Sequence, residues 1–178
     1  MFVGEPLKDI CARFGASKQA WALLREGMAP EDFVAALVEH KDCVSAIEFM
    51  AHAMPPREGV WWGCLCLQHA CGENLAPPER AALQAATVWV IWPTEGCRAA
   101  AYAPAQAAGI TSPAGALAMA AHLAGVAGPV PVTPATGVAN AVKMTTLKGA
   151  PAKIKDTQRL YVELGVGVAE GRFKWPRA

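Results

Sequence analysis

Apolar side chains recur every three to four residues along most of the chain, and proline or glycine interrupts this pattern at short intervals. A period near 3.6 is typical of amphipathic helices, whereas half-buried strands alternate apolar and polar residues. Strand-like alternation is almost absent here, so the pattern predicts an all-α protein built from short helices. The predicted helices cover residues 30–40, 42–54, 56–71, 77–92, 94–108, 112–125, 135–147 and a last segment from 151 onward.

The ends of several predicted helices carry residues that favour those positions. Pro30 and Pro113 suit the first helical position, where the backbone nitrogen needs no partner. The side chains of Asp42 and Thr94 can cap helices by accepting a hydrogen bond from a backbone N–H. Pro104 lies inside the fifth predicted helix, so we expect a kink there.

Consecutive helices of similar length predict a single compact bundle of short antiparallel helices over residues 1–178. Residues 56–71 are apolar around most of the helix circumference, which predicts a central helix. A short helical-repeat solenoid is the alternative fold, because successive helical pairs can also stack as repeats. The proline-rich stretch 125–134 favours an extended path and marks the place where a C-terminal unit could be divided from the body. The apolar tail 173–176 is expected to fold back onto the body.

The composition narrows the classes of function. With 53% apolar and 17% charged residues the chain can build a core, and its formal net charge of +1 offers no basic surface for nucleic acid. No charged residue occurs between Arg98 and Lys143, yet prolines and glycines cut this stretch below the roughly 20 apolar residues that a membrane span needs. The N-terminus lacks the basic and apolar regions of a secretory signal, so we expect a cytoplasmic protein without a membrane span.

Six cysteines and four histidines are the natural candidates for metal or nucleophilic chemistry. The densest cluster, formed by Cys64, Cys66, His69 and Cys71, does not suit zinc, because Cys64 and Cys66 point to nearly opposite sides of a continuous helix. We therefore interpret most of the cysteines as buried apolar residues and expect no metal or other cofactor. A catalytic Cys–His pair stays open as an alternative, but nothing in the sequence selects one of the histidines.

Two glycines near the end of the chain invite a nucleotide-binding interpretation. Gly165 and Gly167 resemble part of a dinucleotide-binding loop, but no strand precedes them. Glycines that allow helices to pack closely explain these positions better. The Gly-x-Ser-x-Gly and His-Glu-x-x-His motifs and a phosphate-binding loop with lysine are absent from the sequence.

Large aromatic side chains and an isolated ion pair make up the candidate partner-binding site. Glu95 and Arg98 lie three residues apart on one helix face, and Arg98 is the last charged residue before the long neutral stretch. Trp61, Trp62 and Trp92 come from two successive helices and are large enough to anchor a protein interface. A structural interpretation stays open as well, with the tryptophans in the core and Arg98 bonded to carbonyls at a helix end.

Four segments carry a resemblance to a known group of proteins. They are Trp61-Trp62, the run from Trp89 to Arg98, the run from Ser112 to Ala121, and Leu164-Gly165. Together they resemble an uncharacterised family of Ala-rich helical bacterial proteins encoded near type VI secretion genes, from residue 55 to the C-terminus. The resemblance implies a cytoplasmic accessory or adaptor role in a secretion system, and it transfers no catalytic residue.

Two classes of function follow from these observations. The leading hypothesis is a non-enzymatic protein-interaction module that docks another protein, such as a secretion-system component, or a second copy of itself. Its basis is the combination of a weakly charged, Ala-rich chain with the absence of catalytic motifs. The alternative is a small hydrolase or transferase that uses a Cys and a His on neighbouring helices. A measurement of thiol reactivity distinguishes the two hypotheses, because a catalytic Cys reacts at pH values well below the ordinary thiol pKa of about 8.5.

Overall fold

The computed structural model describes residues 2–126 and 133–176, and every regular element in these ranges is a helix. The all-α prediction is therefore confirmed. The helices are α1 (Leu7–Phe14), α2 (Lys18–Leu23), α3 (Pro30–Glu39), α4 (Cys43–Ala53), α5 (Pro56–Cys71), α6 (Pro77–Ile91), α7 (Glu95–Ala100), α8 (Tyr102–Ala108), α9 (Pro113–Leu123), α10 (Pro134–Thr146), the 3-10 turn η1 (Pro151–Lys153) and α11 (Ile154–Ala169).

The predicted helix ends are confirmed where a side chain provides the cap. Asp42 accepts a hydrogen bond from the Ser45 N–H at 3.1 Å, and Thr94 accepts one from the Cys97 N–H at 3.2 Å. The segment around Pro104 is not a kinked helix but two helices, α7 and α8, which part at Ala101. Proline has no N–H to donate to the carbonyl four residues earlier, so the helix is interrupted before it.

Two helices, α1 and α2, precede the predicted ones. They contain eight and six residues, which is too short for a helical period to stand out in the sequence. α1 is amphipathic and packs against α4, where Ile10 and Cys11 are fully buried.

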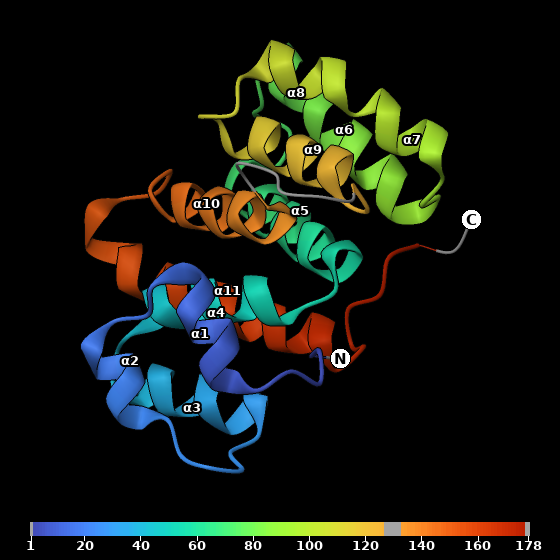
Figure 1. Ribbon diagram of the computed structural model, residues 1–178. Helices are drawn as coiled ribbons and strands as arrows, with labels where there is room; N and C mark the ends of the chain where they lie inside the picture. Colours follow the sequence, from blue (N-terminus) through green and yellow to red (C-terminus); the bar gives the residue numbers. More distant parts are fainter. Residues whose placement is uncertain (1, 127–132, 177–178) are drawn as a thin grey trace.

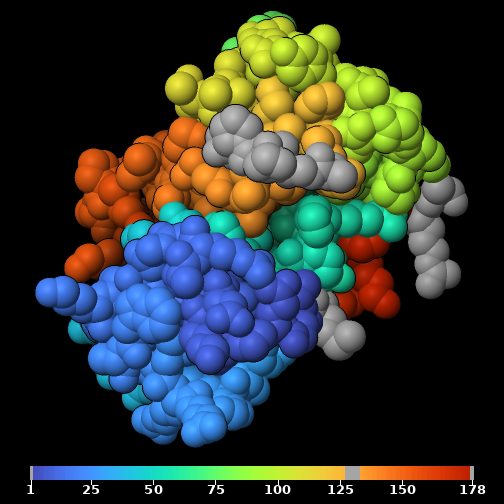
Figure 2. Space-filling model, viewed as in Figure 1, coloured from blue at the N-terminus to red at the C-terminus, as the bar shows by residue number. Residues whose placement is uncertain are grey.

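The helices are arranged in two groups that α5 and α10 join (Figure 1). In the first group α4 contacts α1, α3, α10 and α11, and in the second α9 contacts α6, α7, α8 and α10. In the space-filling view the N-terminal helices and the helices of residues 80–125 lie at opposite ends of the molecule (Figure 2). Contacts such as α4 with α10 and α5 with α11 join elements that are far apart along the chain, so the bundle prediction holds and the solenoid alternative is wrong.

Helix α9 packs closely because its side chains are small. Eight of its 11 residues are buried, and most of these are alanine or glycine. A Cβ added at Gly137 in α10 would lie 3.1 Å from the Ala120 Cβ and 3.2 Å from the Ala116 carbonyl oxygen. A Cβ at Gly63 in α5 would collide with the Leu117 side chain. The helices α5 and α10 thus each approach α9 through a glycine.

The helix α5 is central, as predicted, and its Trp62 joins it to α11. Trp62 is fully buried, and its indole Nε1 donates a hydrogen bond of 2.8 Å to the carbonyl of Tyr161. Gly165 lies one turn after Tyr161 in α11. A Cβ added there would lie 2.8 Å from the Trp62 Cε2 atom and would collide with the Met50 methyl group. The interpretation of Gly165 as a close-packing residue is confirmed, and no dinucleotide loop exists here.

The proline-rich stretch at 125–134 falls largely outside the described residues, which resume at 133. The helices on either side of it, α9 and α10, pack against each other, and α10 also contacts α4 and α5. The tail folds back onto the body as predicted, because the Trp61 Nε1 donates a 2.9 Å hydrogen bond to the Phe173 carbonyl.

We expect Gly165→Ala to destabilise the protein, because the buried Trp62 ring cannot move away from the added methyl group. Overpacking of this kind costs about 1–3 kcal/mol, and each kcal/mol lowers the melting temperature by about 2–4 °C in a chain of this size. Gly96→Ala in α7 is the control, since its Cβ meets only the Thr94 Oγ1, at 4.0 Å. A Gly165→Ala protein that melts with or above the wild type in thermal denaturation would contradict the packing argument.

Candidate protein-interaction site

The structure divides the five predicted partner-binding residues into two sets. Trp61 and Trp62 are buried, with exposed fractions of 9% and 0%, and both indole N–H groups donate to backbone carbonyls inside the protein. Other parts of the chain cover both rings in this structure, which corrects their place among the candidates for an exposed site. Trp92, Glu95 and Arg98 lie at the surface, where α6 ends and α7 begins.

The chain turns sharply between α6 and α7, and backbone hydrogen bonds fix the turn on both sides of Pro93. The Trp92 N–H donates to the Val88 carbonyl and the Thr94 N–H to the Trp92 carbonyl, both at 2.8 Å. The Trp92 side chain is 48% exposed. A large aromatic side chain is thus held at the surface by a rigid backbone.

Arg57 of α5 also stabilises this turn. Its guanidinium donates to the carbonyls of Val90 and Ile91, at 2.7 and 3.1 Å. These carbonyls belong to the last turn of α6, where no helical N–H is available to them. The sequence gives no signal for this contact, because Arg57 and Ile91 are 34 residues apart and meet only through the packing of α5 on α6.

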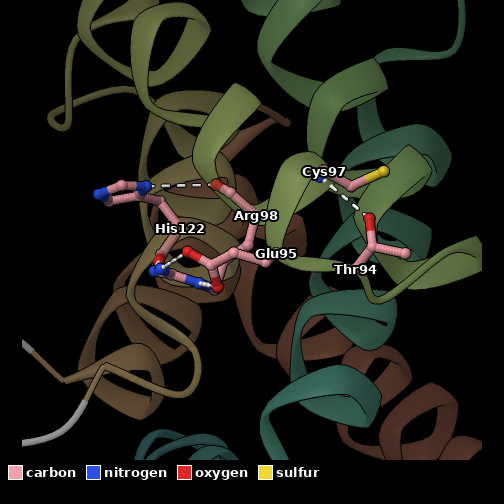
Figure 3. A network of polar contacts seen from close by, with 5 residues as sticks. All are labelled: Thr94, Glu95, Cys97, Arg98 and His122. Atoms are coloured by element: carbon pink, nitrogen blue, oxygen red, sulfur yellow. Dashed lines mark hydrogen bonds and ion pairs between the residues drawn. The ribbon is translucent and has the colours of Figure 1, made fainter.

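Arg98 donates three hydrogen bonds, two within α7 and one that joins α7 to α9 (Figure 3). Its Nε and Nη2 donate to the two carboxylate oxygens of Glu95, at 2.8 and 2.5 Å, and its Nη1 donates to the His122 carbonyl at 2.5 Å. The predicted ion pair and the predicted bond to a helix-end carbonyl are both confirmed. The hydrogen bonds from Arg98 lower the pKa of the Glu95 carboxyl, so the carboxylate is charged at neutral pH.

His122 of α9 makes a second hydrogen bond with Arg98. Its Nδ1 lies 3.2 Å from the Arg98 carbonyl oxygen, and because a carbonyl only accepts, Nδ1 carries the hydrogen (Figure 3). The imidazole ring also packs against Tyr102, with ring centroids 5.0 Å apart. Tyr102 is 48% exposed, so a second aromatic side chain lies at the surface beside this network. The sequence analysis missed both residues, because no local pattern shows that α9 ends beside α7.

We name this surface the α6–α7 corner, made up of Trp92, Glu95, Arg98, Tyr102 and His122. Tyr102 packs beside a polar network whose charges cancel, and Trp92 is exposed three residues before Glu95, at the end of α6. Tryptophan, tyrosine and arginine are the residue types that most often dominate binding energy at protein interfaces. The arrangement suits the docking of a protein.

Four of the six cysteines are enclosed in the core. Cys11, Cys43, Cys64 and Cys66 are buried. Burial raises the pKa of the Cys64 thiol to about 12 and that of Cys66 well above its usual value, so both stay protonated at neutral pH. In the part of the chain that the structure describes, no hydrogen bond joins a cysteine to a histidine.

The cysteine cluster of α5 is spread around the helix, as the sequence analysis expects. Cys64 and Cys66 are buried, whereas His69 is exposed and packs edge-on against Tyr161. Among the described residues, no three His, Cys, Asp or Glu side chains gather closely enough to hold a metal ion. Within the same ranges, none of the helices has the length and apolar character needed to cross a membrane.

We expect Arg98→Ala to lower the melting temperature, because it removes the link between α7 and α9. Arg159→Ala is the matched control. Arg159 also pairs with a glutamate on its own helix, but both side chains of that pair are about two-thirds exposed, so removing it should change little. Equal melting temperatures for the two variants would show that the His122 carbonyl contact contributes nothing to stability.

We expect only Cys71 and Cys97 to react with a thiol reagent in the folded protein at neutral pH, since they are the partly exposed cysteines. The four buried thiols should react only on unfolding. Mass spectrometry after labelling, with and without denaturant, counts the modified sites. Fast labelling of Cys64 or Cys66 in the folded chain would overturn the assignment of these residues to the core and revive the enzymatic alternative.

Comparison with known proteins identifies a family but no characterised relative. No curated protein and no solved structure matches the chain. The sequence model of a family of unknown function matches residues 33–169, which include the α6–α7 corner and leave α1, α2 and the C-terminal tail outside. The match covers well over half of the chain, so the chain belongs to this family of unknown function, DUF6931.

Proposed function

We propose that this chain is a non-enzymatic protein-interaction module, an adaptor or accessory subunit that docks another protein through the α6–α7 corner. The observation that carries the proposal is the exposure of Tyr102 beside a polar network that joins two helices, together with the exposure of Trp92 at the turn that leads into α7. Each of the two residues is 48% exposed, and burying its apolar surface in a partner is favourable.

The rigidity of the corner supports a docking role. Binding costs less when side chains and backbone are already held in the bound geometry. Arg98 is bonded to Glu95 and to the His122 carbonyl, and Arg57 holds the end of α6. Since the charges of Glu95 and Arg98 cancel, we expect the complementary surface of the partner to be apolar. It should also carry hydrogen-bond donors that can reach the exposed Glu95 carboxylate.

The resemblance to Ala-rich proteins encoded near type VI secretion genes supplies the class of partner. Two of the segments that carry it, 89–98 and 112–121, contribute Trp92, Glu95 and Arg98 and most of α9. We therefore propose a cytoplasmic component of such a secretion system as the partner. A second copy of this chain is the alternative occupant of the corner.

No observation favours the hydrolase or transferase alternative. Such an enzyme needs a thiol that ionises near neutral pH beside a histidine. The pKa values of Cys11, Cys43, Cys64 and Cys71 are all raised by burial, and the described histidines bind backbone carbonyls or pack against aromatic rings.

We expect Trp92→Ala and Tyr102→Ala to reduce partner capture from the native host at least tenfold each, which corresponds to about 1.4 kcal/mol of binding free energy. Their melting temperatures should stay close to that of the wild type, because both rings lie at the surface. Quantitative mass spectrometry of material captured on the tagged chain measures the loss.

Trp21→Ala is the matched control, since Trp21 is 42% exposed on α2, outside the family match. Unchanged capture by both corner variants would refute the proposal, and so would an equal loss with Trp21→Ala. Light scattering of the purified wild type identifies the case in which the captured partner is a second copy.

A further inference from the structure

The C-terminal tail, residues 172–176, turns back from the end of α11 and runs along the side of the molecule towards α6 and α7 (Figure 1). Gly171 has a φ of 74°, a left-handed conformation that glycine adopts without strain. The N–H groups of Arg172 and Phe173 both donate to the Gly167 carbonyl, at 2.8 and 3.2 Å. This turn directs the tail away from the helix axis and onto α5.

Two side chains of α5 hold the tail. The Trp61 Nε1 donates 2.9 Å to the Phe173 carbonyl, and the Arg57 guanidinium lies 4.2 Å from the centre of the Trp175 ring. Arg57 is itself fixed by two carbonyls at the end of α6, so the ring stacks on a cation that cannot swing away. The tail therefore lies at the junction of α5 and α6.

A cleft of about 790 Å³ continues from this junction between α5, α6 and the loop that connects them. Pro176 lies at its rim. Trp61, Leu75 and Leu83 form apolar parts of the wall, whereas Gln68, Asn74 and Thr87 place hydrogen-bonding groups along it. The cleft is large enough for several residues of an extended peptide.

The contacts of the tail are those by which proteins recognise extended peptides. One main-chain carbonyl accepts from a fixed tryptophan N–H, one aromatic ring stacks on an arginine, and a proline lies at the rim of a cleft that Trp61 lines. Proline-containing extended segments bind such clefts readily, because little conformational entropy is lost. None of these three contacts depends on the covalent connection to α11.

We propose that the cleft between α5 and α6 is a peptide-binding site for an extended partner segment that carries an aromatic residue followed by proline, and that the chain's own tail occupies one end of it as a tethered ligand. The tail carries this pattern as Trp175 and Pro176. A partner segment displaces the tail from Trp61 and Arg57 and extends further into the cleft. The proposal does not rest on the α6–α7 corner as a docking surface.

Tethering makes the tail a strong competitor, because a short linker gives an effective concentration in the millimolar range. A free peptide must overcome this competition in the wild-type chain. Removing the aromatic side chains of the tail removes the competitor while every residue of the cleft is retained. The affinity for a free peptide should therefore rise in such a variant.

The test uses the full chain with Phe173→Ala and Trp175→Ala together, and a fluorescent peptide with the sequence of residues 171–176. We expect fluorescence anisotropy to show binding at least about tenfold tighter than to the wild type. A peptide with alanine in place of tryptophan should lose binding. Trp175→Ala alone is the second variant, because Phe173 also packs on Gly167 of α11 and its loss could disturb that helix. Both variants are called opened variants, since each weakens the binding of the tail to α5. Circular dichroism confirms the folding of each variant.

Equal peptide affinity for the wild type and the opened variants would overturn the proposal, as would tight binding of the alanine peptide. A wild-type dimer that the two tail substitutions dissociate would assign the cleft to the tail of a second copy and would also overturn it. Tyr102→Ala should leave peptide binding unchanged. The failure of the corner as a docking surface is thereby distinguished from the failure of the cleft.

Discussion

The contact between Trp62 and α11 is the constraint on which the rest of the structure depends. The indole fits against α11 because Gly165 has no side chain there, and its N–H is satisfied by the Tyr161 carbonyl. The next residue, Gly63, admits Leu117 of α9. Two successive residues of α5 thus fix the group of helices around α4, which includes α11, against the group around α9. The surface features at both ends of α5 follow from that placement.

Once α5 and α9 are in place, arginines hold the ends of two helices near the surface. Arg57 reaches from α5 to the last carbonyls of α6, and Arg98 reaches from α7 to the last turn of α9. A cation at a helix C-terminus is favourable, because unpaired carbonyls and the helix dipole concentrate negative charge there. The α6–α7 corner and the site of the tail both lie beside Arg57, so the same packing that stabilises the bundle also exposes its candidate binding surfaces.

Local interactions were predictable from the sequence, and contacts between distant helices were not. The caps at Asp42 and Thr94 and the Glu95–Arg98 pair depend on residues three apart, which a helical period places together. Two other contacts depend on how helices pack against each other, which no local pattern encodes. They are the hydrogen bond from Arg98 to the His122 carbonyl and the stacking of Trp175 on Arg57. Trp61 and Trp62 lie in a helix that is apolar around most of its circumference, and that signal for burial was a better guide than the size of their rings.

Photo-crosslinking in the native host tests most directly whether the α6–α7 corner docks a protein. A photoreactive phenylalanine analogue replaces Trp92 in one variant and Trp21 in another, and both rings are exposed to a similar extent. The account predicts a discrete crosslinked product from position 92 and none from position 21. No product from position 92, or the same product from both positions, would contradict it.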